Sequence, residues 1–150
     1  MPPRRRTAVA LCAAAVLVCV PGCSTGPDVV AAPQGATEQC KAAADEFPDR
    51  VSNLLRLDSV RATAAAAWGD PAVIARCGVP AHPPTEVECV EVDDVGWIPR
   101  ELSDGTAFTS FGTDPAIEVL VPAAYEPEPL LLPAFTAAAD ALPKNGLLCR

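Results

Sequence analysis

Histidine and aromatic residues are scarce in this chain of 150 residues. It contains one histidine, His82, and one tyrosine, and its aromatic content is 5%. A histidine-based zinc site is therefore excluded, because it needs more than one histidine, and cysteine ligands would compete with disulfides. A Ser-His-Asp triad would have to use His82, and no serine of residues 37–150 lies in a Gly-x-Ser-x-Gly turn. Glycine-rich phosphate loops are also missing, so no cofactor is expected.

Basic residues are scarce outside the N-terminus. The chain has 11 Lys and Arg against 19 Asp and Glu, and three of the arginines stand at positions 4–6. The chain from Cys23 onward keeps 8 basic and 19 acidic residues, a net charge of −11. Nucleic acid is excluded as a partner, because its binding proteins carry a basic surface. Direct binding to an anionic membrane surface is equally disfavoured.

The N-terminus lacks the run of about 20 apolar residues that crosses a bilayer. It has instead the arginines at 4–6, an apolar run over 8–20 and small residues before Cys23, which are the parts of an export signal. We predict a signal peptide over residues 1–22. Val20-Pro21-Gly22-Cys23 resembles the lipobox of bacterial lipoproteins, whose cysteine carries a diacylglyceryl group. Pro21 departs from that pattern, and a plain secretory signal is the alternative.

The number of cysteines agrees with lipidation of Cys23. Two of the seven cysteines lie in the predicted leader, which leaves five, and an odd cysteine in an exported protein needs an explanation. Lipidation at Cys23 supplies one and leaves four cysteines for two disulfides in an oxidising compartment. The protein is therefore expected on the extracytoplasmic face of the cell membrane, held by its lipid, or else secreted.

Four cysteines allow three pairings, and spacing alone does not choose among them. We favour Cys77–Cys89, because the two flank a proline-rich turn between strand-like runs. Cys40–Cys149 would then join the terminal segments. Free buried thiols are the alternative.

Composition divides the exported chain into a tether and one domain. Residues 23–36 are small and polar, with too little apolar surface to fold, and form a lipidated tether. Residues 37–150 form a single α+β domain. A helix is predicted from Thr37, and a second helical piece follows Pro48. Their apolar faces are formed by Cys40, Ala43, Ala44 and Phe47, and by Val51, Leu54 and Leu55.

Short alternating runs predict strands at 72–77, 87–92, 106–111 and 116–121, with a turn over 93–96. A last helix is predicted over 130–142. We therefore expect an α+β fold with a small antiparallel meander sheet of four to five strands. The N- and C-terminal helices would pack on one face of that sheet.

One block carries a family resemblance. Trp68-Gly-Asp-Pro-Ala-Val-Ile-Ala-Arg-Cys-Gly-Val79 resembles the signature of DUF3515, an actinobacterial family of uncharacterised secreted proteins. Val95-Gly96-Trp97, the segment 108–112 and the strand 116–122 resemble further segments of that family. The resemblance runs from about Cys40 to the C-terminus. It implies export and a role in the cell envelope, and it implies no catalytic residues.

The most suggestive polar and aromatic residues are Trp68, Asp70, Arg76 and Trp97. The first three would form an anion or sugar site, with Trp68 as a stacking surface and Arg76 as a forked donor. Trp97 would stand at the lip of a cleft. In the alternative interpretation both tryptophans belong to the core and Asp70 accepts N–H bonds in a turn.

Acidic residues offer two further interpretations. Asp93 and Asp94, with Glu86, Glu88 and Glu91, would form either a calcium site or a solvated acidic edge. A hydrolase acting on envelope polymers would pair Asp70 with Asp93 or Asp94.

These observations favour a non-enzymatic, lipid-anchored binding or accessory module of the bacterial cell envelope. Its expected partners are the membrane, through the lipid, and an envelope protein or cell-wall component. The alternatives are the hydrolase and a purely structural envelope protein.

Overall fold

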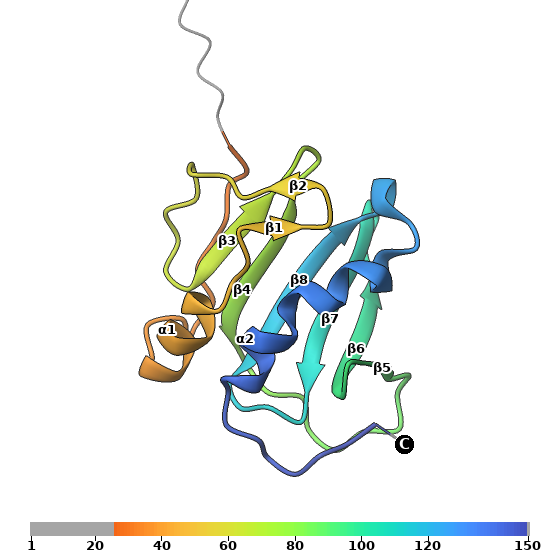
Figure 1. Ribbon diagram of the computed structural model, residues 1–150. Coiled ribbons are helices and arrows are strands. Elements are labelled where there is room, and N and C mark those ends of the chain that lie inside the picture. The colour runs from red at the N-terminus through yellow and green to blue at the C-terminus, as the bar shows by residue number, and fades with distance from the viewer. Residues whose placement is uncertain (1–25, 150) are drawn as a thin grey trace, which may run out of the picture.

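Six antiparallel strands form the main sheet of the computed structural model, which describes residues 26–149 (Figure 1). Their order is β3-β4-β8-β7-β6-β5. The strands are β3 (Ala65–Trp68), β4 (Val73–Val79), β5 (Val90–Val92), β6 (Val95–Glu101), β7 (Gly105–Phe111) and β8 (Ala116–Pro122).

The predicted meander is only part of this sheet. Strands β5 to β8 follow one another as neighbours, and β4 then joins the meander through β8. The predicted number of four to five strands was too low, because β3 has no alternating pattern. Its sequence is Ala-Ala-Ala-Trp, and it forms a strand by pairing with β4, with Ala65 opposite Arg76.

A small hairpin replaces the helical piece that was predicted after Pro48. Strands β1 (Arg50–Val51) and β2 (Leu54–Leu55) pair with each other across a turn in which Ser52 has φ +53°. The chain then runs along β3, where Leu57 N–H donates to the Ala67 carbonyl at 2.8 Å. The backbone contact with β3 outweighs the helical spacing of Val51, Leu54 and Leu55. It also covers β3, which would otherwise be an open edge of the main sheet.

The helices are short. Helix α1 (Glu38–Asp45) begins at Thr37, whose hydroxyl accepts the Cys40 N–H at 3.3 Å. After β8 come two 3₁₀ segments, η1 (Ala123–Tyr125) and η2 (Glu128–Phe135), and then α2 (Thr136–Asp140). The helix predicted over 130–142 is therefore mostly 3₁₀ in its first half. Pro133 lies inside η2 and cannot donate an N–H.

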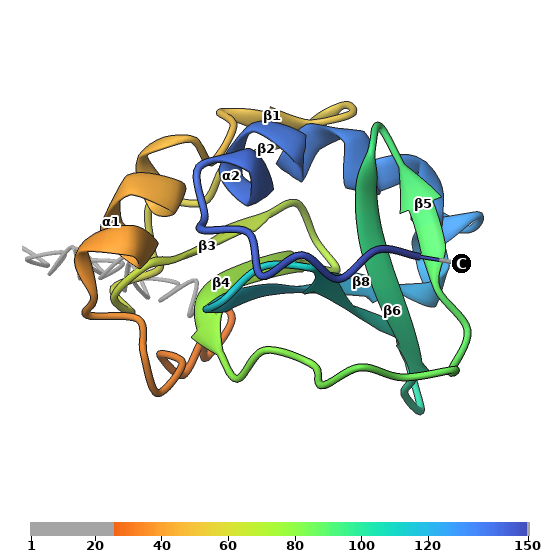
Figure 2. The same ribbon diagram turned by 90° about the horizontal axis from the view of Figure 1, so that it is seen from below.

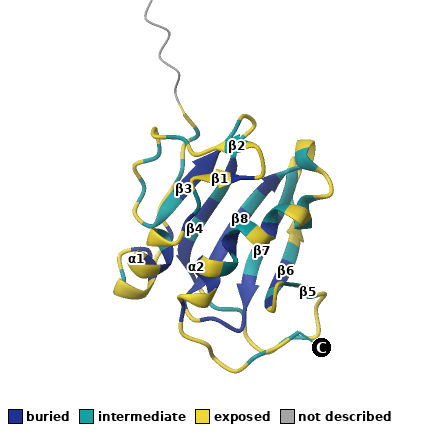
Figure 3. Cartoon of the chain, in the orientation of Figure 1, coloured by how far each residue is buried: buried dark blue, intermediate teal, exposed yellow. Residues whose placement is uncertain are grey.

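The core lies between the helices and one face of the sheet. Figure 2 shows α1 and α2 on one side of the sheet and the loop from β4 to β5 on the other. Figure 3 shows the buried residues concentrated on the strands. On β4, Val73, Ala75 and Cys77 face the core, and the alternation places Ile74 and Arg76 on the opposite face. The largest fully buried side chains are Trp68, Trp97 and Phe135.

Two disulfides are present, as predicted, but their pairing differs from the prediction. Cys40 bonds to Cys77 and Cys89 bonds to Cys149, with Cα–Cα distances of 5.3 and 5.6 Å. Cys40 and Cys77 meet because α1 lies against the core face of β4, and both are fully buried. The predicted pairs Cys77–Cys89 and Cys40–Cys149 were both wrong, since the proline-rich loop after Cys77 crosses the sheet instead of folding back (Figure 2).

Contacts of the domain begin before Thr37. Gln34 N–H donates to the Gly78 carbonyl at 2.9 Å, and Ala32 packs with Val79 and Ala116 in a small apolar cluster. Gly78 sits at an irregularity in the β4–β8 pairing with φ +109°. A Cβ on Gly78 would lie 2.3 Å from the Gly35 nitrogen, so only glycine lets this segment approach.

The predicted signal peptide, residues 1–22, and the predicted lipid site Cys23 lie outside the described residues. Among residues 26–149, no helix has the length and apolar character needed to cross a membrane.

Gly78→Ala should destabilise the protein more than Gly146→Ala. Both glycines have positive φ, which costs an alanine about 1–2 kcal/mol. Only Gly78 also meets backbone atoms, and overpacking of that kind adds about 1–3 kcal/mol; nothing lies within 4 Å of a Cβ at Gly146. Urea unfolding with the disulfides intact measures the difference, and equal losses would contradict the close approach of residues 34–35.

Candidate functional site

A groove of about 760 Å³ opens beside the second disulfide. One wall is the loop that precedes β5, and the other is the C-terminal segment after α2. Phe111, at the end of β7, lines the groove between them. The volume falls in the range of about 300–1,000 Å³ that is common for ligand sites. The lining residues are Pro84, Thr85, Glu86, Val87, Cys89, Phe111, Gly146, Leu147, Leu148 and Cys149.

The Cys89–Cys149 bridge joins the two walls across β6. It lies over Gly96, where a Cβ would come within 2.7 Å of the Cys149 sulfur and 3.4 Å of the Cys89 sulfur. A side chain at Gly96 would therefore collide with the bridge. Glycine at this position lets the C-terminal segment reach the loop before β5.

The C-terminal wall is also held by backbone contacts. Asn145 N–H donates to the Gly112 carbonyl at 2.9 Å, and Thr113 and Lys144 form an isolated antiparallel β-bridge. Gly112 has φ +87°, and a Cβ there would lie 2.3 Å from the Leu147 carbonyl oxygen. The turn after β7 therefore positions the wall.

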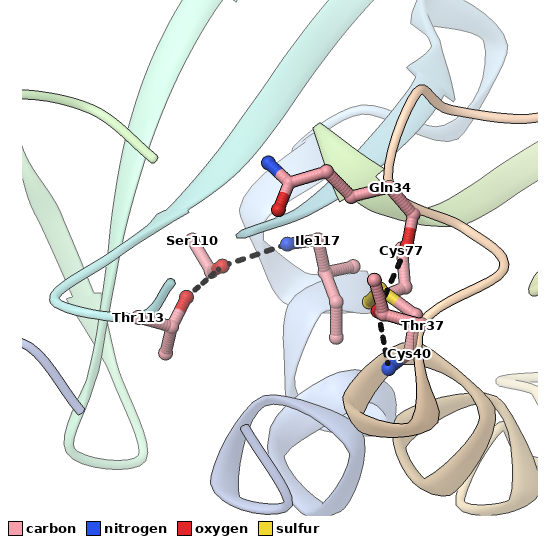
Figure 4. Close-up of a disulfide and its surroundings, with 7 residues drawn as sticks. All are labelled: Gln34, Thr37, Cys40, Cys77, Ser110, Thr113 and Ile117. Atoms are coloured by element: carbon pink, nitrogen blue, oxygen red, sulfur yellow. Dashed lines mark hydrogen bonds between the residues drawn. A yellow bond between two sulfur atoms is a disulfide. The ribbon is translucent and has the colours of Figure 1, made fainter. Parts of the chain in front are cut away.

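A buried pair of hydroxyl groups fixes that turn (Figure 4). Ser110 Oγ and Thr113 Oγ1 are 2.7 Å apart, and Ser110 Oγ accepts the Ile117 N–H at 2.9 Å. Both residues are almost completely buried. Since a buried N–H without a partner is costly, this contact stabilises the turn.

Trp68 is a core residue and not part of an open site. It is fully buried, and its Nε1 donates to the Pro48 carbonyl at 2.9 Å. Its ring makes edge-to-face contacts with Phe47 and Phe135, at centroid distances of 6.1 and 5.3 Å. A stacking surface for a ligand needs an accessible ring face, which Trp68 does not offer.

Arg76 does not meet Trp68 or Asp70. Its Nε donates to Glu118 Oε1 at 2.8 Å, and its Nη1 donates to the Val30 carbonyl at 3.2 Å. Arg100 donates to the other oxygen of Glu118, at 3.2 Å. The Glu118 side chain is only 8% exposed, so two arginines compensate a nearly buried charge on the face away from the helices.

Asp70 and Trp97 also lie apart. Asp70 is exposed and, with Asp58 and Ser59, lines a second hollow of about 570 Å³ near the edge formed by β3. Trp97 is fully buried in the core, and its Nε1 has no hydrogen-bond partner among the described residues. The predicted group of four is therefore divided between the core, the outer face and this hollow.

The carboxylates proposed for a hydrolase are far apart. Asp93 and Asp94 form the turn between β5 and β6, whereas Asp70 follows β3 at the opposite edge of the sheet. About four inter-strand steps of about 4.8 Å separate the β3–β4 turn from the β5–β6 turn, or about 19 Å in all. Glycosidases hold their two carboxyl groups within about 9.5 Å, so this pair cannot serve. Within 26–149, no three His, Cys, Asp or Glu residues are grouped to hold a metal ion.

The groove was not predicted from the sequence. Leu147 and Leu148, between a glycine and a cysteine and outside every predicted helix and strand, are the signal that could have indicated it. Leu148 is 75% exposed and Val87 is 52% exposed. Phe111 was assigned only to a strand.

The fold and the groove define a small α+β domain braced by two disulfides, with an open surface site at one edge of its sheet. The family described as "Protein of unknown function (DUF3515)" matches residues 7–145, and the chain belongs to this family. The predicted family is thereby confirmed. Neither the curated proteins nor the solved structures gave a match.

Trp68→Phe should cost more stability than Trp97→Phe. Both changes remove similar volume from fully buried positions, but only Trp68 donates a hydrogen bond, to the Pro48 carbonyl. Loss of that donor removes a half-buried hydrogen bond, which contributes about 0.5–1.5 kcal/mol. Thermal or urea unfolding of the two variants compares them directly. A larger loss for Trp97→Phe would show that the Trp68 contact has been misassigned.

Proposed function

We propose that this protein is an exported, lipid-anchored and non-enzymatic binding module of the bacterial cell envelope. The observation that carries the proposal is the use of the cysteines. The two disulfides occupy all four cysteines of residues 26–149, so none of them is available to pair with Cys23. Attachment of a lipid gives Cys23 a role, and the preceding leader has the parts of an export signal.

The disulfides favour a location outside the cytoplasm. Structural disulfides form and persist in oxidising compartments and are rare where thiols are kept reduced. The mature chain is small and rich in alanine, so two bridges are a useful supplement to a thin core. Each contributes about 2–4 kcal/mol to the free energy of unfolding.

The arrangement of the chain suits a binding module that faces away from the membrane. Figure 1 shows the start of the described chain at one end of the molecule and the C-terminal segment at the other. A lipid at Cys23 would hold the first end at the membrane. The groove, which the C-terminal segment lines, would then be presented to the envelope.

The lining of the groove favours binding over catalysis. Glu86 is the one ionisable side chain among its lining residues, because Cys89 and Cys149 are bonded to each other. General acid–base hydrolysis of glycosidic bonds commonly needs two carboxyl groups. The remaining lining consists of the Thr85 side chain, the disulfide, apolar side chains and backbone groups, which suits recognition.

Cys23→Ala should abolish lipid attachment, whereas the matched change Cys19→Ala in the leader should leave it intact. Cells that express the full chain are grown with an alkyne-tagged palmitate, and the label on the purified protein is measured. The expected result is label on the unchanged protein and on Cys19→Ala, with none on Cys23→Ala. Equal label on both variants would overturn the anchoring proposal.

A further inference from the structure

We infer that the groove, together with the acidic edge next to it, binds an extended polypeptide segment that carries basic and apolar side chains. This inference rests on the binding function proposed above and adds the site and the class of partner. The acidic edge consists of Glu86, Glu88, Glu91, Asp93 and Asp94.

The walls of the groove offer unpaired backbone groups. Residues 84–88 and 146–149 belong to no helix or strand, and within the described chain they take part in no backbone–backbone hydrogen bond. Only two of their N–H groups are bonded, Val87 to the Thr85 hydroxyl and Leu147 to the Asn145 side chain. Exposed peptide N–H and C=O groups bond to water, which leaves them free to pair with a ligand that replaces this water. An extended peptide supplies matching groups along its length.

The groove also has apolar surface for the side chains of such a peptide. Val87 stands on one wall and Leu148 on the other, and both are more than half exposed. Phe111 lies between the walls and is nearly buried. Burial of these side chains beneath a ligand is favourable, because it removes apolar surface from water.

Charge selects a basic segment. All five carboxylates of the acidic edge are exposed, and none of them forms an ion pair with another described residue. Between Arg76 and Arg100 the sequence has no Lys or Arg. The acidic edge therefore has no internal compensation, and a partner with Lys or Arg provides it. Such charges mainly raise the association rate and the specificity.

Other occupants fit less well. A second copy would bring the same acidic edge and the same net negative charge, which opposes self-association. A polysaccharide commonly needs exposed aromatic surfaces, and the one aromatic residue that lines the groove, Phe111, is 8% exposed. The unpaired backbone groups of the groove walls and the negative charge of the acidic edge therefore both favour a polypeptide as the ligand.

Anisotropy of a dye-labelled peptide tests the inference. The probes are Lys-Val-Lys-Val-Lys-Val and its acidic counterpart Glu-Val-Glu-Val-Glu-Val, added to the full-chain protein purified in detergent. We expect the basic peptide to bind and the acidic one not to bind. Absence of binding by the basic peptide, or equal binding of both, overturns the inference. If the peptide test fails but the unchanged protein still takes up the palmitate label and Cys23→Ala does not, the anchoring proposal stands and only the peptide-binding inference is overturned.

Matched variants locate the site. Glu86→Gln/Glu88→Gln/Glu91→Gln should weaken binding of the basic peptide about tenfold, as expected for three exposed ion pairs. Asp45→Asn/Glu46→Gln/Asp49→Asn removes the same number of exposed charges near α1 and should change the affinity less than about twofold. Equal losses in the two variants would mean general charge attraction and would overturn the site.

Two more measurements test the mode of binding. Val87→Ser/Leu148→Ser changes only exposed side chains of the groove and should weaken the basic peptide several-fold. A basic peptide with alternate backbone nitrogens methylated cannot donate along its edge and should lose most of its affinity. Undiminished binding in both measurements would refute an extended segment lying in this groove.

Discussion

The bond between Cys40 and Cys77 is the contact on which the arrangement of the fold depends. It ties α1 to β4, the strand that joins the β3–β4 hairpin to the meander of β5 to β8. A bridge of this separation contributes about 3–4 kcal/mol, against a total of about 5–15 kcal/mol for a typical domain. The carbonyl of the next residue, Gly78, accepts the Gln34 N–H. Helix α1, strand β4 and the segment that precedes α1 therefore contact one another at this place.

The second bridge has a different task. Cys89 precedes a three-residue edge strand, and Cys149 ends a segment without regular structure. Neither element has much core of its own, and the bridge over Gly96 holds them together. The first bridge therefore supports the core, and the second supports a surface site with apolar walls and an acidic edge.

Local patterns in the sequence identified strands well and their partners poorly. Alternation found β4, β7 and β8, and the number of cysteines indicated two bridges, because both signals are local or a matter of counting. The alanine strand β3 forms through its pairing with β4, and the small hairpin of β1 and β2 leads into the contact of Leu57 with Ala67; periodicity reveals neither contact. Trp68 and Arg76 are eight residues apart in the sequence, but they belong to opposite faces of the sheet. The groove escaped prediction because its two walls are brought together only by Cys89–Cys149.

The central claim is the pairing of the four cysteines, because both the core and the groove depend on it. Proteolysis of the unreduced protein followed by mass spectrometry of the linked peptides tests this pairing directly. The structure predicts one linked pair containing Cys40 and Cys77 and another containing Cys89 and Cys149. Linked peptides containing Cys77 with Cys89, or Cys40 with Cys149, or four free thiols, would contradict the account.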